Sequence, residues 1–197
     1  MKSAFGAACL AASMALCATS GTQAQTVSHS WEGPYVGANL GYQWGSISAN
    51  PTRPGGFAGG IQAGYTWQRQ QFVFGAETDL QLSGAEDVFA PWKFSNPWFG
   101  TLRGRAGFLL NNNTLFYATA GLAYGSLTAQ STTTGVTETK AHPGWTAGIG
   151  VEMAISGNWT AKVEYLYVNL YDRAYALTVA NNGMDASILR MGVNYRF

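Results

Sequence analysis

The sequence predicts an all-β protein, an eight-stranded antiparallel up-and-down transmembrane β-barrel. Charged residues make up 11% of the chain, against about 25% in an ordinary soluble domain, whereas 14% are aromatic. After the first 24 residues, no stretch approaches the roughly 20 apolar residues of a membrane-spanning helix. Apolar residues instead alternate with small or polar ones, which is the period of a β-strand. If such a chain crosses a membrane, it must do so as a closed barrel.

The N-terminal residues 1–24 are predicted to be a secretory signal peptide. Lys2 gives it a positive start, a mostly apolar stretch follows, and Thr22-Gln23-Ala24 has small residues at the positions that a signal peptidase reads. Its removal leaves a short periplasmic stretch, residues 25–32, followed by the barrel over residues 33–197.

The mature chain has no thiol and no net charge. Both cysteines, Cys9 and Cys17, lie in the signal peptide, so neither a disulfide nor a cysteine metal site is expected. Lys2 is the only charge of the signal peptide, so the eleven basic residues become ten and equal the ten acidic ones. A neutral chain argues against a nucleic-acid partner, which requires a basic surface.

Eight segments carry the period-two pattern. In the first, the even positions from Val36 to Trp44 are apolar, and the residues between them are small or polar. The other seven apolar faces run over alternate residues of 59–67, 72–82, 98–108, 116–124, 145–153, 159–167 and 187–197. None of these faces carries a charge, which is expected where strands contact lipid.

The opposite faces of the same segments hold the charges: Glu77, Asp79, Arg103, Arg105, Glu152, Lys162, Glu164, Arg190 and Arg196. In a soluble sandwich or lipocalin-like barrel, charges face water and the aromatic residues fill the interior. The interior of a small barrel could not hold so many aromatic rings. The pattern therefore favours an outer-membrane barrel, whose apolar face touches lipid and whose polar face fills the lumen.

The connections between the segments alternate in length. Short ones are predicted at 69–71, 111–113 and 156–158, and long ones at about 45–56, 83–96, 126–142 and 170–184. In this class the short turns and both termini lie in the periplasm and the long loops face outside. Aromatic residues cluster at both ends of the strands, as two interfacial girdles do: Tyr42, Trp44, Trp98, Tyr124, Trp145 and Tyr167 at the outer ends, and Trp67, Phe72, Phe108, Phe116, Trp159 and Phe197 at the periplasmic ends.

Five motifs in order resemble the small outer-membrane β-barrel proteins of alphaproteobacteria, the porin-family or outer-membrane immunogenic proteins. They are Trp31–Gly37, Phe72–Asp79, Leu102–Gly107, Leu115–Gly121 and Gly192–Phe197. The resemblance implies a location in the bacterial cell outer membrane, a structural or surface-antigen role, and contact with lipid and lipopolysaccharide. It also implies that Tyr195 and Phe197 form the terminal signal that the barrel-assembly machinery recognises.

The charges of the inner face are expected to fill a narrow lumen. Residues opposite each other across a hairpin have numbers with a constant sum, and this rule pairs Glu77 with Arg103, Glu152 with Lys162, and Glu164 with Arg190. We therefore predict a lumen largely plugged by an ion-pair network of Glu77, Asp79, Arg103, Arg105, Glu152, Lys162, Glu164 and Arg190. The alternative is a narrow diffusion pore.

Catalysis, metals and cofactors find little support in the residues. A lipid-cleaving barrel needs a base beside a nucleophile, and the mature chain has two histidines, His29 in the N-terminal stretch and His142, expected to face solvent at the outer rim. We predict no enzyme, no metal and no cofactor. The remaining alternative is that the long loops bind haem or a host or phage component. The contact residues would be Phe89, Trp92, Tyr171 and Tyr175, and the haem ligands would come from His142, Tyr171, Tyr175 and Met184.

Overall fold

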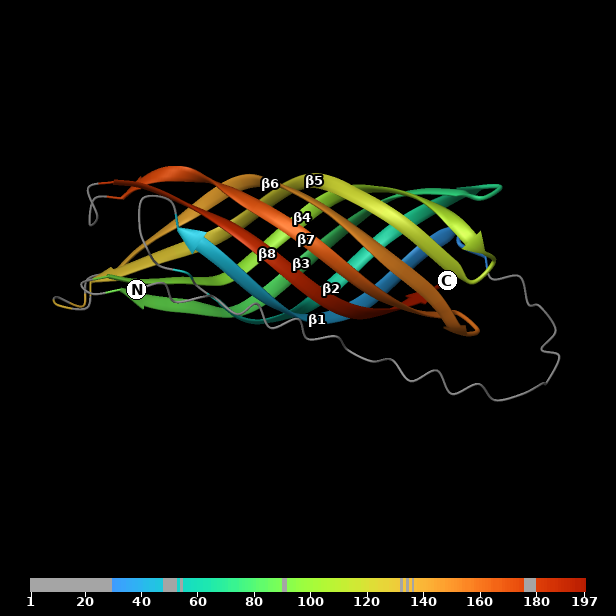
Figure 1. Cartoon of the computed structure of the whole chain (residues 1–197), viewed down its shortest axis with the longest axis horizontal. Helices are drawn as coiled ribbons and strands as arrows, with labels where there is room; N and C mark the ends of the chain where they lie inside the picture. Colours follow the sequence, from blue (N-terminus) through green and yellow to red (C-terminus); the bar gives the residue numbers. More distant parts are fainter. Residues whose placement is uncertain are drawn as a thin grey trace, which may run out of the picture.

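The computed structural model describes residues 30–47, 53, 55–89, 92–131, 133, 135, 137–175 and 180–197. Eight antiparallel strands close into a barrel in sequence order, and β8 pairs with β1 (Figure 1). This confirms the predicted fold class. The strands are β1 (Gly33–Ile47), β2 (Gly55–Arg69), β3 (Phe72–Phe89), β4 (Trp92–Asn111), β5 (Thr114–Ser131), β6 (Thr137–Ser156), β7 (Trp159–Tyr175) and β8 (Ala180–Arg196). The predicted signal peptide and His29 lie outside the described residues.

Three two-residue turns connect strands at one end of the barrel, which we call the turn end. They are Gln70-Gln71, Asn112-Asn113 and Gly157-Asn158, at the sites predicted for the short connections. Gln70 and Gly157 have positive φ angles of 55° and 53°, a conformation common in tight hairpin turns. The start of β1 and the C-terminus also lie at the turn end (Figure 1). We call the opposite end the hairpin end.

Three of the four predicted long loops, 83–96, 126–142 and 170–184, are wrong for most of their length, because the strands continue through them. β3 runs to Phe89 and β4 starts at Trp92, so the segment predicted as a loop over 83–96 is mainly a β-hairpin, with a register shift between Leu82 and Ala85. The strands have 15 to 20 residues, whereas about 9 to 11 suffice to cross a bilayer. The alternation of apolar residues identifies only the part of each strand whose outer face is apolar. The strands remain paired with their neighbours beyond that part.

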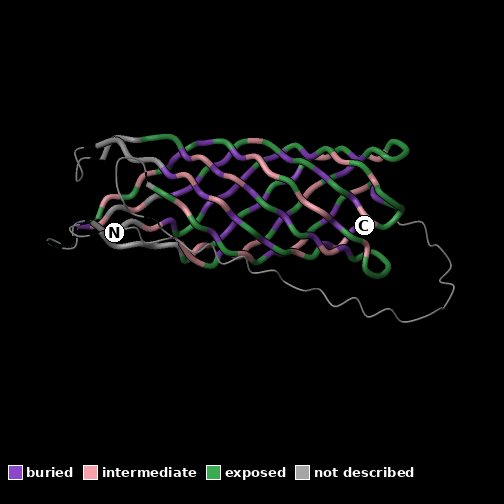
Figure 2. The backbone as a smooth tube through the Cα atoms, viewed as in Figure 1, coloured by how far each residue is buried: buried purple, intermediate pink, exposed green. Residues whose placement is uncertain are grey.

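Burial alternates along each strand as the period-two pattern predicts (Figure 2). Outward residues such as Leu40 and Met191 are 61% and 67% exposed, and their inward neighbours are mostly buried. Gly100 is an exception on the outward face, because the ring of Tyr124 covers it: a Cβ placed there would lie 2.6 Å from the ring. The assignment of the two faces is otherwise confirmed.

The interior of the barrel is layered along its axis. Toward the hairpin end, inward side chains form an apolar cluster, here called the apolar layer: Ala58, Phe99, Ala123, Leu166, Val168, Leu170, Met184, Ala186 and Ile188. A smaller apolar cluster at the turn end contains Trp31, Val73, Leu115 and Tyr117. Buried charged residues lie between the two. The expectation of a small or polar inner face therefore fails toward the hairpin end, where large apolar side chains point inward beside polar ones such as Gln43 and Asn96.

Candidate functional site: the charged centre of the barrel

Nine buried charged side chains meet inside the barrel, and none is more than 4% exposed. We call them the central cluster: Glu77, Asp79, Arg103, Arg105, Glu152, Lys162, Glu164, Arg190 and Arg196. They come from five strands, β3, β4, β6, β7 and β8. Each points inward because it occupies the inward parity of its strand, opposite an apolar outward neighbour. The eight residues predicted for the network are all present, and Arg196 joins them.

The three predicted pairs lie opposite each other in the strand ladders. Two of them are also in contact: Arg103 with Glu77, and Arg190 Nη2 with Glu164 Oε2 at 2.6 Å. Lys162 lies opposite Glu152 in the ladder, but its Nζ is 3.0 Å from each carboxylate oxygen of Glu77. The strand register therefore predicts which residue lies beside Lys162 in the sheet, but it does not predict the partner of its ion pair.

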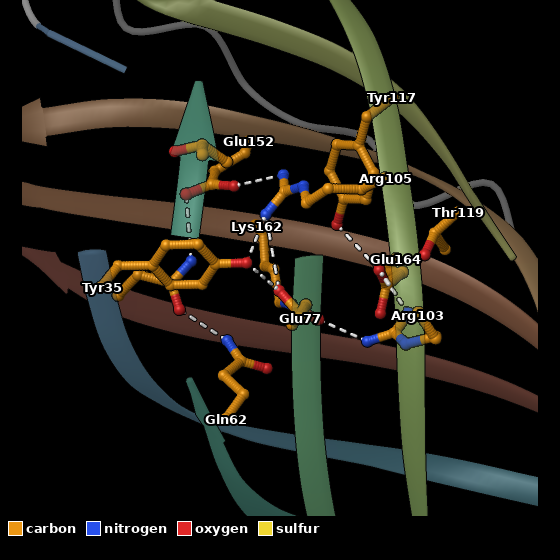
Figure 3. A network of polar contacts seen from close by, with 12 residues as sticks. Tyr35, Gln62, Glu77, Arg103, Arg105, Tyr117, Thr119, Glu152, Lys162 and Glu164 are labelled. Carbon is orange, nitrogen blue, oxygen red and sulfur yellow. Dashed lines mark hydrogen bonds and ion pairs between the residues drawn. The ribbon is translucent and has the colours of Figure 1, made fainter. Parts of the chain in front are cut away.

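Several ion pairs connect opposite walls of the barrel. Glu77 belongs to β3 and Lys162 to β7, which are four strands apart in a ring of eight. Arg103 of β4 reaches Glu164 of β7 at 3.1 Å, and Asp79 of β3 accepts from Arg190 of β8 at 3.1 Å. Figure 3 shows Glu77 in the middle of this arrangement, with Lys162 and Arg103 directed at it from different strands. Long side chains in a narrow lumen can reach across it, so contacts are not limited to ladder neighbours.

Two tyrosines complete the hydrogen bonding of the central cluster. The Tyr35 hydroxyl donates to Glu77 Oε2 at 2.7 Å and accepts from Arg105 Nη1 at 3.0 Å. The Tyr117 hydroxyl donates to Glu164 Oε1 at 3.0 Å, and the Arg105 guanidinium lies 4.0 Å from the centre of the Tyr117 ring. Buried charges require hydrogen-bond partners as well as counter-charges, and the two phenols supply the hydrogen bonds and, at Tyr117, a ring face for the Arg105 cation.

Trp31 covers the central cluster from the turn end, a contact that the sequence did not predict. Its indole is fully buried, and its ring N–H donates to the carbonyl oxygen of Asn112 at 3.1 Å. The Trp31 carbonyl oxygen accepts from Arg196 Nη2 and from Thr66 Oγ1, each at 2.5 Å, and the Arg196 guanidinium lies 5.2 Å from the ring centre. The available signal was Trp31 itself, a large aromatic residue that precedes the first strand.

The two residues of the predicted assembly signal lie on the outward face at the turn end. Phe197 is 69% exposed, and its ring lies 5.2 Å from that of Tyr195 in an edge-on arrangement. The Phe197 backbone N–H donates to the Pro34 carbonyl oxygen at 3.1 Å, so the last residue lies beside the start of β1.

The candidate loop ligands are placed differently from the prediction. His142 does not face solvent: it is buried, and its Nδ1 lies 2.8 Å from the carbonyl oxygen of Tyr171. Met184 is buried in the apolar layer. Tyr171 is exposed, and the side chains of Phe89, Trp92 and Tyr175 fall outside the described set. Two of the four proposed haem ligands are therefore inaccessible, because burial separates them from any external ligand.

Metal-ligand geometry is not found in the described part of the chain, which contains no group of three or more His, Cys, Asp or Glu residues placed to hold a metal ion. The described residues also contain no helix that is long and apolar enough to span a membrane.

A closed ring of eight antiparallel strands with an apolar outer surface, aromatic residues at both ends and charges inside defines a small transmembrane β-barrel. A family model described as outer membrane protein beta-barrel domain matches residues 9–197. The chain belongs to this family, whose members reside in the bacterial outer membrane.

Relatives with similar sequences include the 31 kDa outer-membrane immunogenic protein of Brucella melitensis, 36% identical over 89% of this chain and 88% of that protein. A 22 kDa outer membrane protein of Rhizobium leguminosarum is 34% identical over 85% of this chain and 79% of its own length. Among solved structures, the neisserial surface protein A matches with a TM-score of 0.61 at 17% identity, covering 83% of this chain and 97% of that one. The family model and the two relatives confirm the predicted family and location, and the structural match confirms the fold.

Proposed function

We propose that this chain is a non-catalytic structural protein of the outer membrane and a surface antigen, with a lumen filled by its own side chains. The immunogenic role is named for the Brucella relatives, and it is extended here to this chain. The observation that carries the proposal is the set of ion pairs between opposite walls, above all Lys162 to Glu77 and Arg103 to Glu164.

Three layers support a filled lumen. The central cluster crosses the interior, the apolar layer packs on its hairpin side, and Trp31 packs on its turn side. The cavity beside Gln43, Asn96 and Phe99 has a volume of only about 10 Å³, roughly the space of one water molecule. An ion that crossed the barrel would have to displace buried, paired side chains, which is costly.

Single-channel recording in planar bilayers tests the proposal. The purified protein is expected to give no stable conductance steps, whereas a general porin in the same bilayers gives large ones. Trp31→Ala removes the ring at the turn end but leaves the central cluster intact, so this variant is also expected to stay closed. Stable steps from the unaltered protein would favour the diffusion pore and contradict the proposal.

Assembly and lipid contact complete the proposed role. We infer that the outward pair Tyr195 and Phe197 is recognised by the barrel-assembly machinery, since both rings are accessible at the strand end where a partner can meet them. The outward apolar surface is inferred to contact outer-membrane lipid and lipopolysaccharide.

A further inference from the structure

A polar patch interrupts the apolar outward surface near the hairpin end of β7 and β8. It consists of Tyr165, Tyr167, Asn169, Asp185 and Ser187, and Asn169 lies opposite Asp185 in the ladder. Asp185 is the one charged side chain among the described outward positions of four neighbouring strands, which are 34–46 of β1, 145–155 of β6, 159–171 of β7 and 185–197 of β8.

The side chains of the polar patch hold the Asp185 carboxylate in one orientation. The Tyr167 hydroxyl donates to Asp185 Oδ1 at 2.7 Å, and Asn169 Nδ2 donates to the same oxygen at 2.6 Å. The second carboxylate oxygen, Oδ2, has no donor among the described residues, and the residue is only half-buried. A carboxylate accepts hydrogen bonds at both oxygens, so Oδ2 is available to a donor from outside the protein.

Aromatic rings border the polar patch on both sides. The Trp145 ring lies 5.4 Å from the Tyr167 ring, and the Trp44 ring lies 6.4 Å from the Tyr165 ring. Trp and Tyr prefer the level of the lipid headgroups, where the ring meets apolar chains and its polar tip meets water. With the turn end in the periplasm, as this class of barrel has it, the polar patch lies at the headgroup level of the outer leaflet.

We propose that the polar patch binds sugar hydroxyl groups in the headgroup of an outer-leaflet glycolipid. A hydroxyl that donates to Asp185 Oδ2 forms a charge-assisted hydrogen bond, and Asn169 Oδ1 offers a second acceptor beside it. The phosphate groups of such a lipid do not fit, because they repel the carboxylate and the outward positions named above carry no cation. The bordering rings cover the apolar faces of the sugar.

Lipid A in nanodiscs of defined phospholipids is the probe. The purified protein is reconstituted with and without lipid A, and the affinity is taken from the rise in its unfolding temperature as lipid A is added. Asp185→Asn is expected to weaken the apparent affinity about tenfold, the loss that one hydrogen bond to a charged group predicts. Asp172→Asn is the matched control, because it removes one exposed negative charge from the same hairpin and is expected to change nothing.

Two further measurements decide the result. Asn169→Ala, which removes the neighbouring amide and its hydrogen bond to Asp185, is expected to weaken lipid A binding, measured against the unfolding temperature of the same variant in phospholipid alone. The difference between the unaltered protein and Asp185→Asn is expected to persist in EDTA, because a sugar hydroxyl needs no metal. Equal affinities of these two proteins for lipid A would overturn the proposal. It would also fail if EDTA abolished the difference and magnesium restored it, since the contact would then be a cation-bridged phosphate. Neither outcome bears on whether the lumen conducts.

Discussion

The central cluster and the apolar layer occupy the same lumen, share the strands β4, β7 and β8 and are equally buried, yet different forces hold them. Glu164 and Leu166 are adjacent inward residues of β7 and both are 0 to 1% exposed. Glu164 is held by specific ion-pair partners, Arg103 and Arg190. Leu166 packs against apolar neighbours, and another apolar side chain of similar volume could take its place. The loss of stability in the central cluster should therefore depend on which residue is changed. In the apolar layer it should depend on how much side-chain volume is removed.

The largest loss is expected from removing the charge at the centre of the cluster. Glu77 contacts Arg103, Arg105 and Lys162, so Glu77→Gln leaves buried cations without their counter-charge. The free energy of unfolding should fall by about 3–5 kcal/mol, measured by reversible urea unfolding in detergent micelles. Glu32→Gln, at an exposed position, is the control and should cost almost nothing. Equal effects of the two variants would mean that the cluster contributes no net stability.

A loss of about 2–4 kcal/mol is expected for Leu166→Ala in the apolar layer, because the truncation leaves a cavity in a packed core. The matched control is Leu82→Ala, at a position that is 70% exposed on the outward face, where lipid can fill the space. Similar unfolding free energies for these two variants would show that the apolar layer is not tightly packed.

A second substitution in the Glu77→Gln variant is expected to restore about 1–2 kcal/mol of the unfolding free energy that Glu77→Gln loses. Lys162→Met in the Glu77→Gln background removes the cation whose Nζ contacts Glu77 at 3.0 Å. The double variant should therefore be more stable in urea than Glu77→Gln alone, although Lys162→Met by itself destabilises. If the two losses simply add, the Lys162–Glu77 contact carries no coupling energy and the specificity attributed to the cluster is wrong.

The smallest effect on stability, under about 1 kcal/mol, is expected from deleting Phe197, outside both layers. The ring is mostly exposed, and the deletion removes one backbone hydrogen bond, to Pro34. In cells, in contrast, the deletion should strongly reduce the amount of protein at the surface if the terminal aromatic residues act as the assembly signal. Surface labelling and heat-modifiable gel migration separate the two effects, and normal surface amounts would argue against that signal.

The sequence predicted the features that depend on contrast between neighbouring residues. The alternation of apolar and polar residues predicted the two faces and the eight strands. The constant sum of residue numbers across a hairpin predicted that Glu77 and Arg103 lie opposite each other. The strand ends beyond Leu82 were missed, because pairing continues there after the contrast between the two faces is lost.

Features that depend on the shape of the closed lumen could not be predicted in this way. Around Leu166 and Val168 both faces of β7 are rich in apolar or aromatic residues, so alternation gave no sign of an apolar interior. Lys162 pairs with Glu77 because the two side chains can reach each other across the barrel. Strand register gives no information on this distance. The burial of His142 has the same origin, since its position next to Pro143 resembled an exposed rim.

The contact between Trp31 and Arg196 joins residues that are 165 positions apart in the chain. Arg196 lies at the end of β8, so a chain that lacks this strand can neither form this contact nor close the barrel on β1. Contacts of such long sequence separation slow folding, because the loop entropy is lost before any stabilising interaction is gained. The ring of strands therefore closes only once β8 is present, which makes closure a late event in the folding of the barrel.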